Sequence, residues 1–196
     1  RIDLDKEISV VLARSQTGTI INFPVAENAH VNGILHTTTV PTSVSAEQSQ
    51  KAIQIANDIA KGLGYVGTMA VEFFVSQGGE IIANEIAPRP HNSGHYTLDA
   101  CSTSQFEQQV RMLCGLPAGD CDLISPVVMV NLLGDVWGHS QPHWETLLSE
   151  TNIKLHLYGK QEARPGRKMG HFNVLAETVE QAMQQAEICF KNLKAD

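Results

Sequence analysis

Positive charge is scarce in this chain of 196 residues. Its 14 lysines and arginines stand against 21 aspartates and glutamates, which gives a formal net charge of -7 with histidine neutral. Nucleic acids and anionic membrane surfaces attract proteins that carry an excess of positive charge. The composition therefore argues against both kinds of partner, and any site for an anion has to be built locally.

Paired cysteines and long apolar runs are also lacking. The four cysteines, Cys101, Cys114, Cys121 and Cys189, form no Cys-x-x-Cys pair, so neither a zinc site nor a disulfide framework is expected. No apolar stretch approaches the roughly 18 residues of a membrane helix, and residues 1–7 have no signal-peptide core. We expect a cytoplasmic protein with no membrane partner. Because the chain opens abruptly with a strand pattern and no initiator methionine, we also expect a fragment.

Strand and helix patterns alternate along the chain and predict an α+β fold, an antiparallel sheet with helices. Residues 1–118 form the larger unit, and residues 119–196 form a small β-rich unit with a terminal helix. The predicted strands are 7–14, 19–25, 34–40, 67–75, 80–86, 126–133, 153–158 and 169–176. A capping box at 45–48 begins a helix that stops at Gly64. Further helices cover 104–114, with Phe106, Val110 and Leu113 on one face, and 178–193, with Val179, Met183, Ala186 and Phe190 as the buried stripe.

Two acidic residues face each other across the predicted hairpin of residues 67–86. A turn centred between Gly78 and Gly79 pairs Glu72 with Glu85, and such a like-charge pair ordinarily destabilises a sheet. A divalent cation reverses that effect, and Mg²⁺ suits hard carboxylate oxygens with few protein ligands. The alternatives are a solvated pair on an open face, or a register shifted by one residue.

The second strand of this hairpin runs into a polar loop that two prolines stiffen. Residues 84–95 read Asn-Glu-Ile-Ala-Pro-Arg-Pro-His-Asn-Ser-Gly-His. Arginine binds a carboxylate or bicarbonate through two hydrogen bonds, and histidine and asparagine supply further donors for an oxyanion. Each side chain alone is more simply explained as a cap for nearby backbone. Together, Arg89, His91, Asn92, Ser93 and His95 predict acyl-phosphate chemistry.

A second polar cluster lies late in the chain and is basic. Lys160, Arg164, Arg167 and Lys168 are four of the 14 basic residues, and they fall in a glycine-containing turn between two predicted strands. Exposed basic loops are usually only solvated. In an acidic chain, such a focus of positive charge can also capture a phosphate monoester.

These segments together resemble one family of purine-biosynthetic enzymes. Residues 6–10, 72–74, 84–95, 158–160 and 166–171 are similar to those of 5-(carboxyamino)imidazole ribonucleotide synthetase, the ATP-grasp ATPase component of phosphoribosylaminoimidazole carboxylase. The likeness runs through essentially the whole chain. Glu72 together with Asn84-Glu85 is a pattern shared by many ATP-grasp enzymes. The loop of residues 88–95, Pro-Arg-Pro-His-Asn-Ser-Gly-His, is highly specific to this family. The resemblance makes residues 1–118 the C-terminal half of an ATP-grasp domain and 119–196 a small C-terminal domain.

The resemblance also implies a role for each candidate residue. Glu72 and Glu85 correspond to the Mg²⁺ carboxylates, and Arg89 and His91 to the contacts of bicarbonate and carboxyphosphate. The implied contacts of ATP are Glu7, His30, Asn84 and Glu85, and those of the 5′-phosphate of the ribonucleotide are Lys160 and Arg167. Asn92, Ser93, His95 and Lys168 are further candidate contacts.

The implied reaction is the carboxylation of aminoimidazole ribonucleotide, driven by ATP and bicarbonate. ATP is a co-substrate, one or two Mg²⁺ ions are the cofactor, and a homodimer is the implied assembly. Members of the family carry an N-terminal domain and an ATP-lid domain before the strand that opens here, so we expect this chain alone to be inactive. Two alternatives stay open: another purine-pathway ATP-grasp ligase, such as the formate-dependent glycinamide ribonucleotide transformylase, and a non-catalytic ATP-grasp remnant.

Overall fold

A single antiparallel sheet runs through the structure, a computed structural model that describes residues 2–138 and 140–194. Its strand order is β6-β5-β1-β3-β4-β7-β9-β8, with β2 paired to β1. The predicted α+β class with an antiparallel sheet is confirmed. The strands are β1 (Leu4–Arg14), β2 (Ile20–Asn22), β3 (Ala26–Val31), β4 (Ile34–Val40), β5 (Gly67–Ser76), β6 (Ile81–Ala87), β7 (Val127–Leu133), β8 (Ile153–Leu157) and β9 (Lys168–Leu175).

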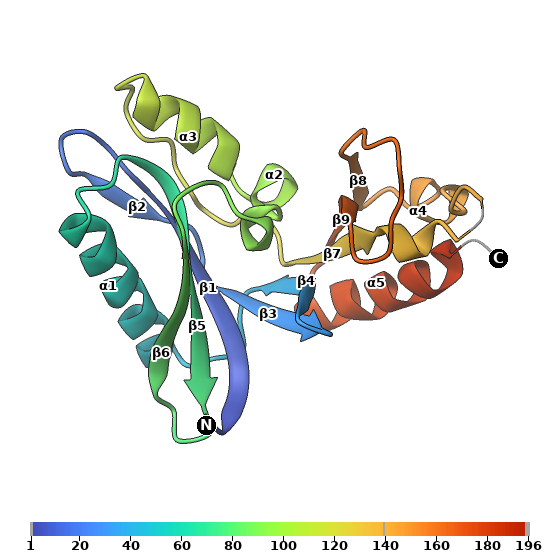
Figure 1. Ribbon diagram of the computed structural model, residues 1–196, viewed down its shortest axis with the longest axis horizontal. Helices are drawn as coiled ribbons and strands as arrows, with labels where there is room; N and C mark the ends of the chain where they lie inside the picture. Colours follow the sequence, from blue (N-terminus) through green and yellow to red (C-terminus); the bar gives the residue numbers. More distant parts are fainter. Residues whose placement is uncertain (1, 139, 195–196) are drawn as a thin grey trace.

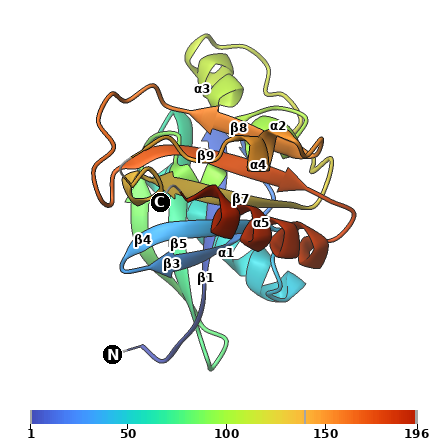
Figure 2. The same ribbon diagram turned by 90° about the vertical axis from the view of Figure 1, so that its right-hand side faces the viewer.

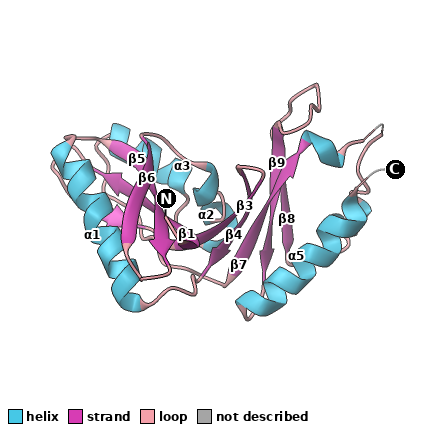
Figure 3. Ribbon diagram, turned by 60° about the horizontal axis from the view of Figure 1, so that its bottom comes forward, coloured by secondary structure: helices cyan, strands magenta, loops and turns pink. Residues whose placement is uncertain are grey.

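Five α-helices among the described residues lie on the faces of this sheet (Figures 1 and 2). They are α1 (Ala46–Gly62), α2 (Thr97–Ala100), α3 (Gln105–Leu113), α4 (Glu145–Leu148) and α5 (Val179–Leu193), with 3-10 turns η1 (Asn92–Gly94) and η2 (Gly134–Val136). Along β1, Ile8, Val10 and Leu12 pack toward α1, whereas Val11 packs in the cluster that contains Ala100 of α2. Helices α4 and α5 pack on the β7–β9 end, and Figure 3 shows α5 lying along these strands. The sheet is thus the shared middle layer of the molecule.

Helix α1 begins where the capping box predicts. The Ser45 hydroxyl accepts a hydrogen bond from the Gln48 amide at 3.1 Å, and the Gln48 side-chain oxygen accepts one from the Ser45 amide at 3.0 Å. These two bonds satisfy donors that a helix start otherwise leaves free. Three buried alanines, Ala52, Ala56 and Ala60, let the helix lie close against the sheet.

Two predictions for residues 1–118 are wrong in detail. The strand expected at 19–25 is the short β2, and residues 26–31 form a separate strand, β3. Pro24 separates the two because it has no amide hydrogen for a ladder. In α3 the expected apolar face is exposed: Phe106, Val110 and Leu113 are 40%, 57% and 58% accessible. The side of α3 that packs on the protein carries Gln105, Gln108 and Met112.

The terminal helix has its predicted bounds within one residue, but its buried stripe is rotated. Ala186 is buried as predicted, together with Ala182, Cys189 and Leu193. The other predicted residues are only partly covered: Val179, Met183 and Phe190. Smaller side chains face the sheet because α5 lies close over β7 and β9. The larger apolar groups border this contact instead.

The β5–β6 hairpin contains a bulge that the sequence does not announce. Ser76 and Glu80 bond across the turn, which centres it on Gly78, and Phe73 pairs with Ala83. One extra residue in β6, Asn84, then shifts the register, so that Glu72 pairs with Glu85. The predicted pairing of the two glutamates is confirmed, although the turn centre was misplaced. The extra residue of the bulge compensates for the turn lying earlier in the sequence than predicted.

Within the described residues, no helix is long and apolar enough to cross a membrane. All four cysteines are free thiols, and Cys101, Cys121 and Cys189 are buried.

Candidate functional site

A polar cavity of about 470 Å³ gathers side chains from segments that lie far apart in the sequence. Strands β5 and β6 supply the two glutamates, the loop after β6 supplies an arginine and a histidine, and the β8–β9 segment supplies two lysines. The β3–β4 hairpin closes one side. The lining residues are His30, Gly33, Ile34, Leu35, Glu72, Glu85, Arg89, His91, Lys160, Gly166 and Lys168.

The paired carboxylates form the acidic wall of this cavity. Burial raises the pKa of Glu72, and Glu85 and Glu7 raise it further, while His30 and Lys168 act in the opposite direction. Glu72 Oε1 is buried and has no hydrogen-bond partner in the described structure. Among the described residues no group of three or more His, Cys, Asp or Glu side chains could hold a metal. Two carboxylates, one with an unsatisfied oxygen, nevertheless fit Mg²⁺, which completes its shell with water and phosphate oxygens.

Glu7 and His30 lie next to each other on the neighbouring strands β1 and β3. His30 Nδ1 is 2.5 Å from Glu7 Oε2, and both side chains are largely covered, with 19% and 25% accessible. The register of β3 with β4 shifts between Ala29 and His30, where His36 is the extra residue of β4. His30 lines the cavity, and Glu7 lies beside His30 without lining it.

His91 enters the cavity as a neutral imidazole. Burial lowers its pKa to about 4, and the positive charges of Arg89 and Lys168 contribute to the same effect. Its Nδ1 accepts a hydrogen bond from the Ser93 amide and lies 2.9 Å from the Ser93 hydroxyl. Since the Ser93 amide donates to Nδ1, we assign the ring proton to Nε2. His91 is therefore a hydrogen-bond donor at neutral pH rather than a cation.

A buried glutamine, Gln105, fixes the loop that carries these groups. Its Oε1 accepts from the His91 amide at 2.9 Å, and its Nε2 donates to the His91 carbonyl at 2.7 Å and to His95 Nδ1 at 2.9 Å. A Cβ on Gly94 would lie 2.5 Å from Gln105 Oε1, so glycine is required there by close packing. Sequence reasoning missed Gln105, and nothing in its local pattern marks it.

Of the four residues in the predicted basic cluster, two line the cavity and two do not. Lys160 and Lys168 line the cavity, and Lys160 Nζ donates to the Lys168 carbonyl at 2.6 Å. Burial lowers the pKa of Lys168, whereas the nearby Glu72 and Glu85 raise it. Arg164 pairs with Glu162, and Arg167 donates to the Glu162 carbonyl at 3.1 Å.

The remaining predicted residues are not part of the cavity wall. Asn84 is the exposed bulge residue of β6. Asn92 and Ser93 are buried inside the loop, and His95 stacks on His171 behind it. The structure thus brings together the carboxylates, His30, Arg89, His91, Lys160 and Lys168. Glu7 lies beside His30.

Comparison with known families matches both parts of the chain. Residues 1–106 match the ATP-grasp domain family, and residues 127–185 match the phosphoribosylaminoimidazole carboxylase C-terminal domain family. The first match covers more than half of the chain, so the chain belongs to the ATP-grasp family.

Similar proteins include several N5-carboxyaminoimidazole ribonucleotide synthases, which confirms the resemblance noted from the sequence. The protein of this name from Bacillus subtilis is 48% identical over 184 residues, covering 94% of this chain and 48% of the relative. The one from Brucella melitensis is 46% identical over 170 residues, covering 87% and 46%. The chain spans about half the length of the curated relatives it matches.

Solved structures agree with the sequence matches. A crystal structure of N5-carboxyaminoimidazole ribonucleotide synthetase in its ADP complex superposes with a TM-score of 0.88 at 50% identity, covering 96% of this chain and 49% of that one. The Aspergillus clavatus synthase in complex with ADP and 5-aminoimidazole ribonucleotide has a TM-score of 0.90 at 30% identity, covering 98% and 52%.

Proposed function

We propose that this chain is part of an ATP-dependent carbon–nitrogen ligase. It carboxylates 5-aminoimidazole ribonucleotide with bicarbonate to 5-(carboxyamino)imidazole ribonucleotide, in de novo purine biosynthesis. The observation that carries this proposal is the convergence of paired carboxylates, the Arg89–His91 loop and two lysines on one cavity. The names of the relatives support it, and so does the Aspergillus clavatus complex with ADP and the ribonucleotide.

The proposed chemistry has two steps. A bicarbonate oxygen attacks the γ-phosphorus of ATP, ADP leaves, and carboxyphosphate forms. The amino nitrogen of the ribonucleotide then attacks the carbonyl carbon, phosphate leaves, and the nitrogen loses a proton. Arg89 and the Nε2–H of His91 would hold the oxyanions of bicarbonate and of carboxyphosphate, since positioned donors in a secluded site stabilise developing negative charge.

Glu72 and Glu85 would hold one or two Mg²⁺ ions on the acidic wall of the cavity. The metal, when bound, neutralises the β- and γ-phosphate oxygens. Glu7, His30 and Asn84 would contact ATP on the same side. The Glu7 carboxylate lies beside His30 Nδ1.

The phosphate of the ribonucleotide would bind at the opposite, basic wall. Lys160 and Lys168 reach this wall, and Arg167 on the same β8–β9 segment would be a further phosphate contact. Asn92, Ser93 and His95 would act from within the loop rather than on the substrate.

The remaining proposals concern the whole protein. The relatives are about twice as long as this chain, so we propose that the full-length protein supplies further contacts to ATP and that this chain alone does not turn over. We also propose a division near residue 118 between an ATP-grasp unit and a C-terminal unit, a homodimer, and a cytoplasmic location.

The test measures ADP release by the full-length protein with Mg²⁺, ATP and aminoimidazole ribonucleotide, with and without bicarbonate. We expect release that depends on bicarbonate and that Glu85→Gln abolishes. Release that is indifferent to bicarbonate, or no release, would instead favour the formate-dependent transformylase or a non-catalytic remnant. Ribonucleotide-dependent release by the 196-residue chain alone would contradict its proposed inactivity.

A further inference from the structure

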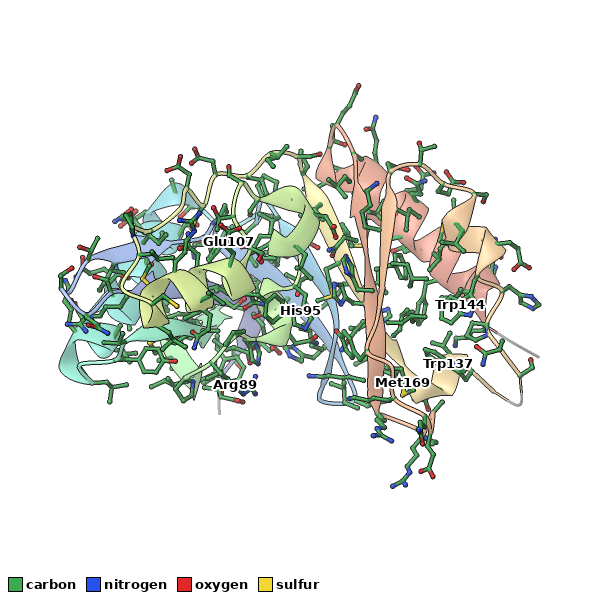
Figure 4. The ribbon with its side chains drawn as sticks, turned by 90° about the horizontal axis from the view of Figure 1, so that it is seen from above. Arg89, His95, Glu107, Trp137, Trp144 and Met169 are labelled. Atoms are coloured by element: carbon green, nitrogen blue, oxygen red, sulfur yellow. The ribbon has the colours of Figure 1, made fainter. Side chains whose placement is uncertain are left out.

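Three histidine rings are stacked in a column behind the cavity. His171 of β9 lies in the middle, with its ring centroid 4.7 Å from that of His95 and 4.6 Å from that of His156. His95 comes from the loop after η1, and His156 comes from β8. We refer to His95, His171 and His156 as the histidine column. Figure 4 shows His95 between the α2–α3 region and strand β9.

The column joins the two polar segments of the site. On one side, His95 Nδ1 accepts from Gln105, the same side chain that holds both backbone groups of His91. On the other side, His171 Nδ1 lies 2.9 Å from the Tyr158 hydroxyl, two residues before Lys160. The column therefore links the Arg89–His91 loop with the segment that presents Lys160 and Lys168.

A carboxylate locks the outer end of the column. Asp99 Oδ2 is 2.8 Å from His156 Nε2 and accepts a hydrogen bond from Asn173 Nδ2 at 2.6 Å. Asn173 Nδ2 also lies 3.3 Å from the His95 carbonyl. These contacts cross from α2 to β8 and β9, so they hold the same two parts of the chain together.

Packing alone does not account for an imidazole in the middle of the column. His171 is 1% exposed, and its Nε2 is buried without a hydrogen-bond partner. A buried unsatisfied polar group is costly, and a phenylalanine would fill the same space without that cost. What the imidazole adds is the hydrogen bond to Tyr158.

We propose that His171 is a positioning residue: its ring holds the Arg89–His91 loop through His95, and its Nδ1 holds the Lys160 segment through Tyr158. The substrate consequence rests on the proposed function, because the two segments would bind bicarbonate and the ribonucleotide phosphate. No group of the column is required to touch substrate. The spacing between the two binding segments is what His171 sets.

Hydrogen exchange of the 196-residue chain tests the structural part, using three variants. His171→Leu removes both ring stacking and the hydrogen bond, so residues 91–95 and 158–168 should both exchange faster, by about tenfold. Tyr158→Phe and His171→Phe keep a flat ring and lose only the hydrogen bond, so only residues 158–168 should change. Asn152→Ala is the control, because it removes hydrogen bonds to Leu175 and Gln185 at the far end of β8. Its effect should not reach residues 91–95.

Kinetics of the full-length protein test the functional part. Loss of one net hydrogen bond predicts that Tyr158→Phe and His171→Phe raise the KM for aminoimidazole ribonucleotide by about two- to tenfold. The KM for ATP should stay within about twofold of the wild-type value. A general loss of structure would raise both KM values, so a selective rise indicates a positioning role. Unchanged exchange at 91–95 in His171→Leu, or equal rises in both KM values, would overturn the inference. Absence of turnover in the wild type would refute the proposed function and leave the exchange result to decide the structural part.

Discussion

The glutamine that fixes the polar loop offers the most direct test of the site architecture. Replacing Gln105 with leucine keeps a similar side-chain volume and removes three hydrogen bonds, two to the His91 backbone and one to His95. At about 0.5–1.5 kcal/mol net for each bond, the expected loss is roughly 3 kcal/mol. The free energy of unfolding should fall by that amount. The His91 amide and carbonyl both lose their partners at once.

Urea denaturation measures this loss as a lower midpoint with an unchanged slope. A loss of that size lowers the melting temperature by roughly 6–12 °C in a protein of this length. Gln54→Leu is the matched control, because the exposed Gln54 bonds only to Asp58 on the same helix, and it should cost less than about 0.5 kcal/mol. If Gln105→Leu costs no more than Gln54→Leu, the loop is held by something else and the reasoning fails.

Three further predictions concern acid stability, backbone packing and the carboxylate pair. Burial lowers the pKa of His91 and His95 to about 4 and that of His171 to about 2. Between pH 6.5 and those values the unfolded chain binds more protons than the folded chain, so the free energy of unfolding falls as the pH falls, by about 2 kcal/mol for each ring between pH 7 and pH 5. A constant free energy of unfolding over this range, measured by urea titration, would contradict this prediction. Gly134→Ala should lower the free energy of unfolding by about 3 kcal/mol or more in thermal melts, because its Cβ would collide with the Arg164 backbone. Gly62→Ala is the control: its Cβ would meet open space, so it should not destabilise the protein. In EDTA, Glu72→Gln should raise the free energy of unfolding by about 1 kcal/mol, because it relieves the repulsion from Glu85. The same variant should no longer be stabilised by added Mg²⁺. If Mg²⁺ still stabilises it, the metal binds elsewhere.

Local features of this chain were predictable, because their signals lie within a few residues of each other. The capping box at Ser45 and the carboxylate pair of the β5–β6 hairpin follow from turn and cap chemistry. The family resemblance added Glu7 and His30, which no local pattern marks. The hairpin bulge escaped prediction because register beyond a turn depends on the pleat of the whole sheet.

Contacts between distant segments could not be predicted from the sequence. Nothing local places Lys168 on the same cavity as Glu72, or Gln105 against the backbone of His91. The exposed face of α3 shows the same limit, since periodicity reveals that a helix has two faces but does not say which one packs. His171 was noted only as part of a strand motif, and its place in the column depends on the fold.

The pairing of β4 with β7 restricts how this chain can move. Four residue pairs, from Thr37 with Val130 to Val40 with Val127, join the two ends of the sheet by a backbone ladder rather than by a linker alone. Rotation of one end against the other, as in a hinged clamshell, would break these hydrogen bonds. The ladder therefore keeps the acidic side of the cavity, with Glu72 and Glu85, and its basic side, with Lys168, in one continuous sheet.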